Sequence, residues 1–178
     1  PTAIGTDSLG NSYVAGWFTG MMIIGDDTFN TNNTIRNLYL AKYDQQGQFI
    51  WSQYIRSTGG GEIRAIAVEP NGDFYFTGVV SDTVIIGTDT FPVSINAITN
   101  DIFVAKMSSA GELIWANRIQ GFSNDSGDAI AIGNGQIYIG GAFIHDTFFA
   151  TDTVRNWNTE RSDFFLAAFG SGTGTELW

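Results

Sequence analysis

A block of about 63 residues recurs three times along this chain of 178 residues, and each copy closes on a tryptophan. The landmarks are three tyrosines spaced by 62 and 63 residues and three tryptophans spaced by 64 and 63, namely Tyr13, Tyr75 and Tyr138, followed by Trp51, Trp115 and Trp178. A sustained period of this size indicates stacked supersecondary units, each of which buries its apolar face against a neighbour.

Four apolar segments occur in each copy, and in the second copy they are residues 65–68, 75–78, 102–107 and 113–115. Glycine-containing turns separate the first segment from the second and the third from the fourth, which is typical of hairpins. The third segment is almost continuously apolar, so we expect it to be buried on both faces. A glycine is shared at the end of the second segment (Gly16, Gly78 and Gly141), which indicates a bend or a close backbone approach.

The segments predict an all-β fold of β-propeller blades, each with four antiparallel strands. A helical solenoid is excluded because no sustained 3.6-residue periodicity is present. The predicted blades are residues 1–56, 57–120 and 121–178, and the last has an incomplete fourth strand. A longer connection between the second and third strands carries Asp27-Thr28-Phe29, Asp89-Thr90-Phe91 or Asp152-Thr153-Val154, whose apolar third residue we expect to cover the edge of each unit.

The second copy carries an ordered series of short motifs: Ala65-Ile66-Ala67-Val68, Gly72-Asp73, Tyr75-Phe76-Thr77-Gly78 and Asp101-Ile102-Phe103-Val104-Ala105-Lys106. This series resembles the SBBP-type β-propeller repeats of bacterial surface and secreted proteins, and the resemblance covers essentially the whole chain. It implies a propeller and an exported location. It implies no common activity and carries over no site residues. The third copy departs from the series, since its first turn is one residue short and Ala168 replaces the lysine.

The chain has 8 Lys and Arg against 18 Asp and Glu, a formal net charge of −10. Such a surface repels phosphate backbones and anionic lipids, which argues against nucleic-acid binding and membrane association. The absence of cysteine excludes disulfides and thiolate metal sites. No apolar run is long enough to span a membrane, so no membrane insertion is expected.

Propellers close with four to eight blades, so three blades leave two open faces. The expected partners are therefore other blades of the same longer chain, or a self-associated copy that would make a six-bladed ring. Because terminal repeats are normally distinct caps, our expectation is that the chain is a fragment of a longer propeller.

The three repeated tryptophans are expected to pack between blades. Trp17 and Trp157 fall outside the repeat register and are candidate ligand-binding residues, Trp157 because it lies in a polar loop. His145 is the single histidine and is a third candidate, although a loop histidine without a catalytic role is the alternative reading. No serine, second base or metal partner recurs near it, so no catalytic residues are predicted.

Two further patterns suggest sites with little specificity. Asp125 and Asp128 lie around a glycine and could bind Ca²⁺, although turn formation explains them adequately, and no other cofactor is indicated. Ser8, Thr83 and Thr153 follow an aspartate and precede an apolar residue, which resembles the general O-glycosylation acceptor of Bacteroidota. Chance is the alternative explanation, because Asp-Thr pairs are common in turns.

These observations favour a non-enzymatic extracellular or bacterial cell-surface module for binding, adhesion or spacing, with a glycan or a surface protein as ligand. A propeller-type polysaccharide hydrolase or lyase is the first alternative. A structural segment of a surface filament is the second.

Overall fold

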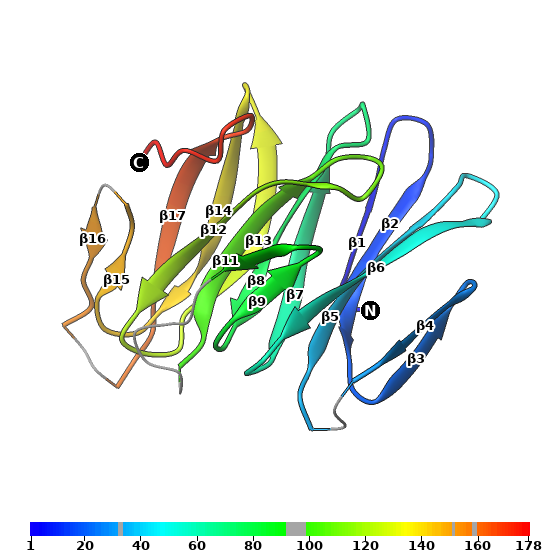
Figure 1. The fold of residues 1–178 in the computed structure, drawn as a ribbon. Coiled ribbons are helices and arrows are strands. Elements are labelled where there is room, and N and C mark those ends of the chain that lie inside the picture. Colours follow the sequence, from blue (N-terminus) through cyan, green and yellow to red (C-terminus); the bar gives the residue numbers. More distant parts are fainter. Residues whose placement is uncertain (32–33, 92–98, 151, 158–159) are drawn as a thin grey trace.

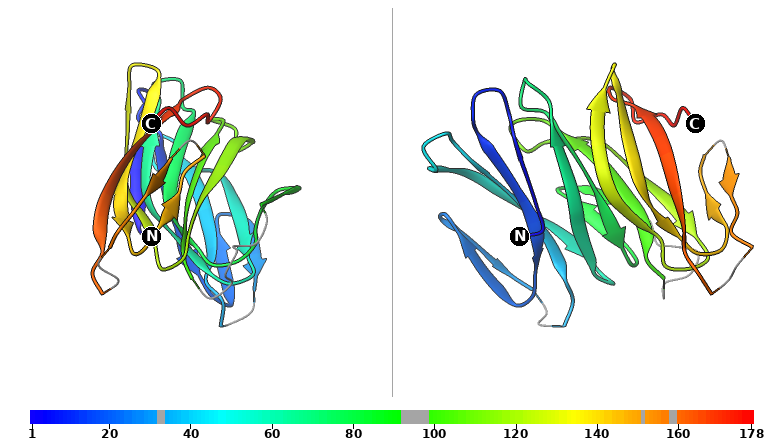
Figure 2. Two further views of the ribbon diagram at one scale, coloured as in Figure 1. Left: turned by 90° about the vertical axis from the view of Figure 1, so that its left-hand side faces the viewer. Right: turned by 180° about the vertical axis from the view of Figure 1, so that it is seen from behind.

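The structure is a computed structural model that describes residues 1–31, 34–91, 99–150, 152–157 and 160–178. Seventeen strands and no helix are found in these ranges (Figure 1). Three twisted antiparallel sheets lie side by side in chain order, and each contains the main strands of one repeat (Figures 1 and 2). The prediction of an all-β fold built from propeller blades is confirmed.

Two blades have four main strands each, and the third has three. Blade 1 is β1 (Ala3–Thr6), β2 (Ser12–Phe18), β5 (Asn37–Tyr43) and β6 (Phe49–Ser57). Blade 2 is β7 (Gly61–Val68), β8 (Phe74–Val80), β11 (Asp101–Met107) and β12 (Leu113–Gly121). Blade 3 is β13 (Ser126–Gly133), β14 (Gln136–Phe143) and β17 (Asp163–Gly170). Its fourth strand is reduced to a bridge between Phe169 and Glu176.

The long connection of each repeat is itself a two-stranded hairpin, which the sequence analysis did not predict. The hairpins are β3 (Met21–Ile24) with β4 (Asp27–Asn30), β9 (Val84–Ile86) with β10 (Asp89–Phe91), and β15 (Thr147–Phe148) with β16 (Thr153–Val154). β9 pairs with β6 of the preceding blade, and β15 pairs in the same way with β12. Each of these hairpins therefore extends its neighbour's sheet to six strands and fastens two blades together. β3 and β4 form a separate two-stranded sheet at one end of the row (Figure 1).

Two apolar cores fill the two junctions between blades. The first contains Tyr13, Leu38 and Leu40 from blade 1 against Phe74 and Phe103 from blade 2. The second is built from the equivalent faces of blades 2 and 3. The predicted burial of the third strands on both faces is confirmed for β5 and β11 but not for β17, where exposed and buried residues are mixed.

The glycine that ends the second segment faces a β-bulge in blades 2 and 3. The bulge in β7 lies between Ile63 and Ala65, and Ile63 is opposite Gly78. A Cβ atom at Gly78 would lie 2.0 Å from the carbonyl oxygen of Glu62, and one at Gly141 would lie 1.8 Å from that of Ser126. No side chain fits at that distance, so the repeat needs glycine here, as the sequence indicated.

Trp51 and Trp115 each form a hydrogen bond across a junction to the next blade. The indole N–H of Trp51 donates to the backbone carbonyl of Ser109 in blade 2 at 3.2 Å, and Trp115 donates to Ser171 in blade 3 at 3.2 Å. Both rings also contact the tyrosine of their own repeat. Trp178 likewise contacts Tyr138 of its own repeat but is 56% exposed, and its packing between blades stays a prediction.

The two ends of the blades differ in what they carry. At one end, tight turns join β1 to β2 and β5 to β6, and their equivalents do the same in the other blades. At the other end, called here the crossover end, β2, β8 and β14 finish and β5, β11 and β17 begin. The crossover end lies at the bottom of Figure 1.

Candidate functional site

The three candidate residues outside the repeat register all lie near the crossover end, but the structure does not bring them together. Trp17 is the penultimate residue of β2, His145 lies between β14 and β15, and Trp157 lies between β16 and β17. Trp17 therefore belongs to blade 1, whereas the other two belong to blade 3. The guanidinium of Arg36 covers the Trp17 ring at 4.1 Å from its centroid, so that face is not open to stack on a ligand.

His145 occupies a position that the backbone itself specifies. Its φ is 64°, and the equivalent positions of the other repeats are Gly20 with φ 71° and Asp82 with φ 76°. All three residues form the left-handed turn that leads from the second strand into the hairpin. This common role explains the position of His145 without a catalytic or binding function.

Trp157 is 87% exposed, as expected for a polar loop. The preceding residue, Asn156, is buried, and its side-chain amide donates to the carbonyl of Arg161. This hydrogen bond fixes the position of Asn156, while the indole of the next residue, Trp157, is exposed to solvent. Large exposed aromatics of this kind are typical of contact surfaces.

The two carboxylates considered for Ca²⁺ have other partners. Asp125 is 1% exposed, and its oxygens accept hydrogen bonds from the Ile144 amide at 3.0 Å and the Thr147 hydroxyl at 2.9 Å. Asp128 binds the Arg64 guanidinium across the junction of blades 2 and 3 at 2.6 Å. Within the described ranges, no group of three or more His, Cys, Asp or Glu side chains could hold a metal ion.

The three candidate acceptors for O-glycosylation lie in turns or at strand ends. The Ser8 hydroxyl donates to the carbonyl of Pro70 at 2.8 Å, and the Thr83 hydroxyl contacts the Asp82 carboxylate at 3.2 Å. Ser8 is exposed, while Thr83 and Thr153 are half-buried. Ser8 is thus the most accessible of the three, and its modification stays a prediction.

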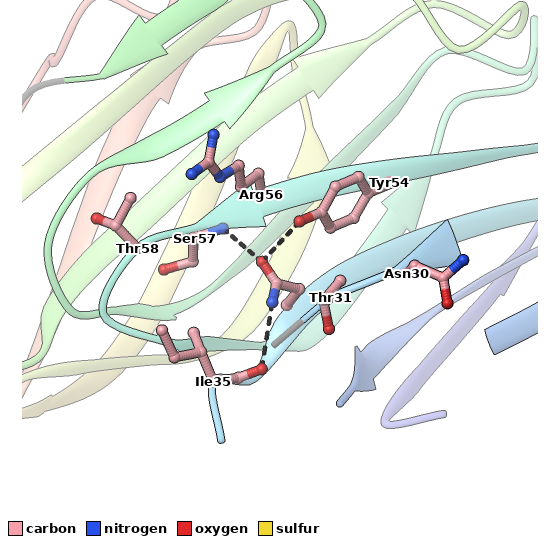
Figure 3. A pocket seen from close by; sticks show the side chains of 8 residues that line it. Asn30, Thr31, Ile35, Tyr54, Arg56, Ser57 and Thr58 are labelled. Atoms are coloured by element: carbon pink, nitrogen blue, oxygen red, sulfur yellow. Dashed lines mark hydrogen bonds between the residues drawn. The ribbon is translucent and has the colours of Figure 1, made fainter. Parts of the chain in front are cut away.

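A hollow lies at the crossover end of blade 1. It has a volume of about 520 Å³ and is lined by Asn30, Thr31, Ile35, Asn37, Tyr54, Arg56, Ser57 and Thr58 (Figure 3). Asn37 lies at its floor, where its side-chain oxygen accepts hydrogen bonds from the Tyr54 hydroxyl at 3.1 Å and the Ser57 amide at 2.9 Å. The Asn37 amide donates to the Ile35 carbonyl at 3.2 Å. Apart from Ile35, the described residues of the lining have polar side chains, and none of them carries a carboxylate.

A second polar hollow of about 310 Å³ opens beside the first, at the junction of blades 1 and 2. The two hollows share the same two segments, because the first is lined by Ile35, Asn37 and Thr58 while the second is lined by Thr34, Arg36 and residues 59–61. The second also contains Arg64, whose guanidinium lies 3.6 Å from its one lining carboxylate, Glu62. We refer to the pair as the arginine-lined surface, defined by Asn30, Arg36, Asn37, Tyr54, Arg56 and Arg64.

In blades 1 and 2, the side chain of the first residue of the third strand forms hydrogen bonds to the fourth strand of the same blade. In blade 2 the equivalent residue is Asp101, which is fully buried and accepts hydrogen bonds from the Arg118 side chain at 2.8 Å and the Gly121 amide at 3.2 Å. Arg118 also forms an ion pair with Asp101 at 2.7 Å. Blade 1 makes the same contacts with a neutral pair, Asn37 and Tyr54, which leaves Arg56 and Arg36 as the charges beside this hollow.

Comparison with curated proteins gives a distant similarity. The chain matches no family model. An uncharacterized WD repeat-containing protein of Acanthamoeba polyphaga mimivirus is 25% identical over 95 residues, which cover 51% of this chain and 7% of that protein. The matched part is thus a small fraction of the relative's length. WD repeats are propeller blades, so the similarity agrees with the observed architecture.

The chain is therefore a β-propeller module, and a propeller scaffold of this kind is compatible with a binding role. The described residues include no helix long and apolar enough to cross a membrane. Sequence reasoning missed the arginine-lined surface, because its residues come from three separate segments and none belongs to a recognisable motif. The only signal was that Arg36 and Arg56 are two of just eight basic residues in an acidic chain.

Proposed function

We propose that this chain is a non-enzymatic extracellular or cell-surface β-propeller module of the SBBP type, which binds an acidic glycan at the arginine-lined surface and serves in adhesion. The observation that carries the proposal is the larger hollow at the crossover end. In a chain of net charge −10, its lining holds Arg56, amide and hydroxyl groups and no carboxylate. The exported location is supported by the resemblance of the repeats to bacterial surface proteins.

The chemistry of the lining matches a sugar that carries a carboxylate. Guanidinium groups donate two parallel hydrogen bonds to a carboxylate, and Asn, Ser, Thr and Tyr side chains exchange hydrogen bonds with hydroxyl groups. Arg36 and Arg56 are both exposed, so their charges are available at the rim. Loops at one end of a rigid β scaffold are also where binding residues commonly lie.

The same lining argues against the hydrolase alternative. Glycoside hydrolysis generally uses two carboxyl groups on either side of the scissile bond. Among the residues that line the larger hollow there is no Asp or Glu, and the smaller hollow has Glu62 next to Arg64. A binding role needs no such pair, so binding is the function that the geometry supports best.

A glycan array with neutral, uronate-bearing and sialylated glycans tests the proposal. We expect the fluorescently labelled chain to bind the acidic glycans, and Arg56→Gln and Arg36→Gln each to reduce that binding by about tenfold. Arg161→Gln is the matched control, since this exposed arginine lies in blade 3 outside the hollow. Equal loss in the control, or binding confined to neutral glycans, would contradict the proposal.

A further inference from the structure

Trp17 and Arg36 form a contact that the other two repeats lack. The Arg36 guanidinium lies over the Trp17 ring, 4.1 Å from its centroid. The strand register gives the equivalent pairs as Val79 with Asn100 in blade 2 and Ala142 with Ser162 in blade 3. Neither of those pairs contains an aromatic ring or a cation, so neither can form a cation–π contact. A blade therefore folds without this contact, and its presence in blade 1 indicates a local role.

Trp17 gives the arginine a rigid support. The indole is half-buried and packs against the core between blades 1 and 2. A guanidinium that stacks on an aromatic ring uses its flat face, while its N–H groups, which lie in its plane, can still donate hydrogen bonds. Arg36 is exposed and makes no ion pair with any residue in the described ranges. Its donors are therefore held in place and remain available to a ligand.

The space beside Arg36 also departs from the repeat. At the junction of blades 2 and 3, two successive polar residues, Asn124 and Asp125, use their side chains in hydrogen bonds. The strand register gives their equivalents at the junction of blades 1 and 2 as Gly60 and Gly61. Both glycines line the smaller hollow of about 310 Å³ together with Arg36. The first junction therefore has open space where the second has polar side chains.

The charges around the smaller hollow favour an anionic group next to Arg36. The other arginine of the lining, Arg64, is paired with Asp128 at 2.6 Å and lies 3.6 Å from Glu62. Arg36 has no such partner among the described residues, and a guanidinium donates two parallel hydrogen bonds to a carboxylate. An acidic group that enters the hollow is therefore attracted to Arg36 more strongly than to Arg64.

We propose that Trp17 is a positioning residue, which holds Arg36 so that its guanidinium binds the carboxylate of an acidic sugar in the smaller hollow. This role rests on the proposed function and deepens it, because it assigns one acidic group of the glycan to that hollow. Trp17 itself does not touch the ligand. Without the indole, the Arg36 side chain samples several rotamers, and ordering it on binding costs affinity.

The test is a double-mutant cycle, measured by isothermal titration calorimetry with trigalacturonate, an acidic trisaccharide, as the probe. Trp17→Leu should weaken binding by about threefold to tenfold, because an arginine side chain must then be ordered on binding. Trp17→Phe keeps an aromatic face and should weaken binding by less than about threefold. In the Arg36→Gln background, Trp17→Leu should change the affinity by less than about twofold, because no cation is left for the ring to hold.

Arg56→Gln provides the matched background, since Arg56 lines the larger hollow and Trp17→Leu should keep its full effect there. Thermal unfolding of each variant records any loss of stability separately. Equal effects of Trp17→Leu with and without Arg36 would mean that Trp17 acts only through the fold, which would overturn its positioning role and leave the proposed function intact. No binding of trigalacturonate at about 10 mM would also overturn it, whereas the glycan array decides the proposed function separately.

Discussion

Two buried carboxylates near the junction of blades 2 and 3 have opposite electrostatic surroundings. Asp101 is paired with the Arg118 guanidinium, which balances its charge. Asp125 accepts hydrogen bonds from two neutral donors, the Ile144 amide and the Thr147 hydroxyl. Burial is the largest influence on Asp125 and raises its pKa to about 6. The folded chain therefore binds a proton at Asp125 more readily than the unfolded chain does.

This difference predicts how Asp125→Asn changes the pH dependence of stability. Between about pH 4 and pH 6 the folded state keeps a proton that the unfolded state has released, so the Asp125 contribution to stability falls as pH rises through this window. The variant removes this contribution. We expect the free energy of unfolding of the variant, relative to the parent chain, to rise by about 1–3 kcal/mol from pH 4 to pH 7.

Urea unfolding at several pH values measures this difference, and Asp128→Asn is the control. Asp128 is an exposed aspartate in the same segment, so Asp128→Asn matches the chemical change without removing a buried carboxyl. A constant difference between the parent chain and Asp125→Asn across the window would refute the assignment.

His145 provides a second prediction for a single residue. Since its φ of 64° is the conformation that glycine adopts without strain, His145→Gly is expected to leave stability unchanged or raise it by up to about 1 kcal/mol. His145→Val should lower stability by more than about 1 kcal/mol, because a β-branched side chain is disfavoured at positive φ. Thermal unfolding of both variants provides the comparison. A strongly destabilised glycine variant would show that the imidazole itself has a role.

At the scale of the element, the blades depend on features that involve two strands at once. A bulge in β7 and β13 brings the backbone against a glycine of the neighbouring strand. A hairpin from each of the second and third repeats completes the sheet of the repeat before it. Each feature is expected to contribute separately to the free energy of unfolding.

Gly78→Ala tests the bulge. The new Cβ atom would lie 2.0 Å from the Glu62 carbonyl oxygen, so β7 and β8 must separate, and we expect a loss of more than about 2 kcal/mol in the free energy of unfolding. Gly172→Ala is the matched control, because nothing lies within 4 Å of a Cβ atom there. Similar stabilities of the two variants in urea unfolding would contradict the bulge geometry.

Ile86→Ala tests the exchanged hairpin. Ile86 is 1% exposed where β9 pairs with β6, whereas its repeat equivalent Ile24 is half-buried in the separate β3–β4 hairpin. Truncation of Ile86 should cost about 2–4 kcal/mol, and truncation of Ile24 should cost about half as much or less. Equal losses, measured by urea unfolding, would mean that β9 contributes no more to the fold than β3.

Local sequence patterns predicted the main strands because their turns and apolar segments recur in register. They did not predict the hairpins, since β9 is three residues long and its partner, β6, lies in another repeat. The recurrence of Ile-Gly-x-Asp-Thr-Phe at residues 24–29 and 86–91 was the signal available. The arginine-lined surface was inaccessible to sequence reasoning because alternate residues of one segment line two different hollows.

At the scale of the whole molecule, the chain is a row of blades with one conserved mode of attachment. Each junction combines an apolar core, a tryptophan hydrogen bond to the next blade and a hairpin added to the preceding blade. The crossover end carries the polar hollows, while the turn end carries repeated contacts such as that between Tyr75 and Glu69. The polar hollows and these tyrosine contacts therefore lie at opposite ends of the blades.

Native-state hydrogen exchange, followed residue by residue, tests this architecture most directly. The amides of β9 and β15 are predicted to exchange at least about tenfold more slowly than those of β3, because the first two strands are added to a neighbouring blade and β3 is not. Equal protection of β3 and β9 would contradict the exchanged hairpins on which the account depends.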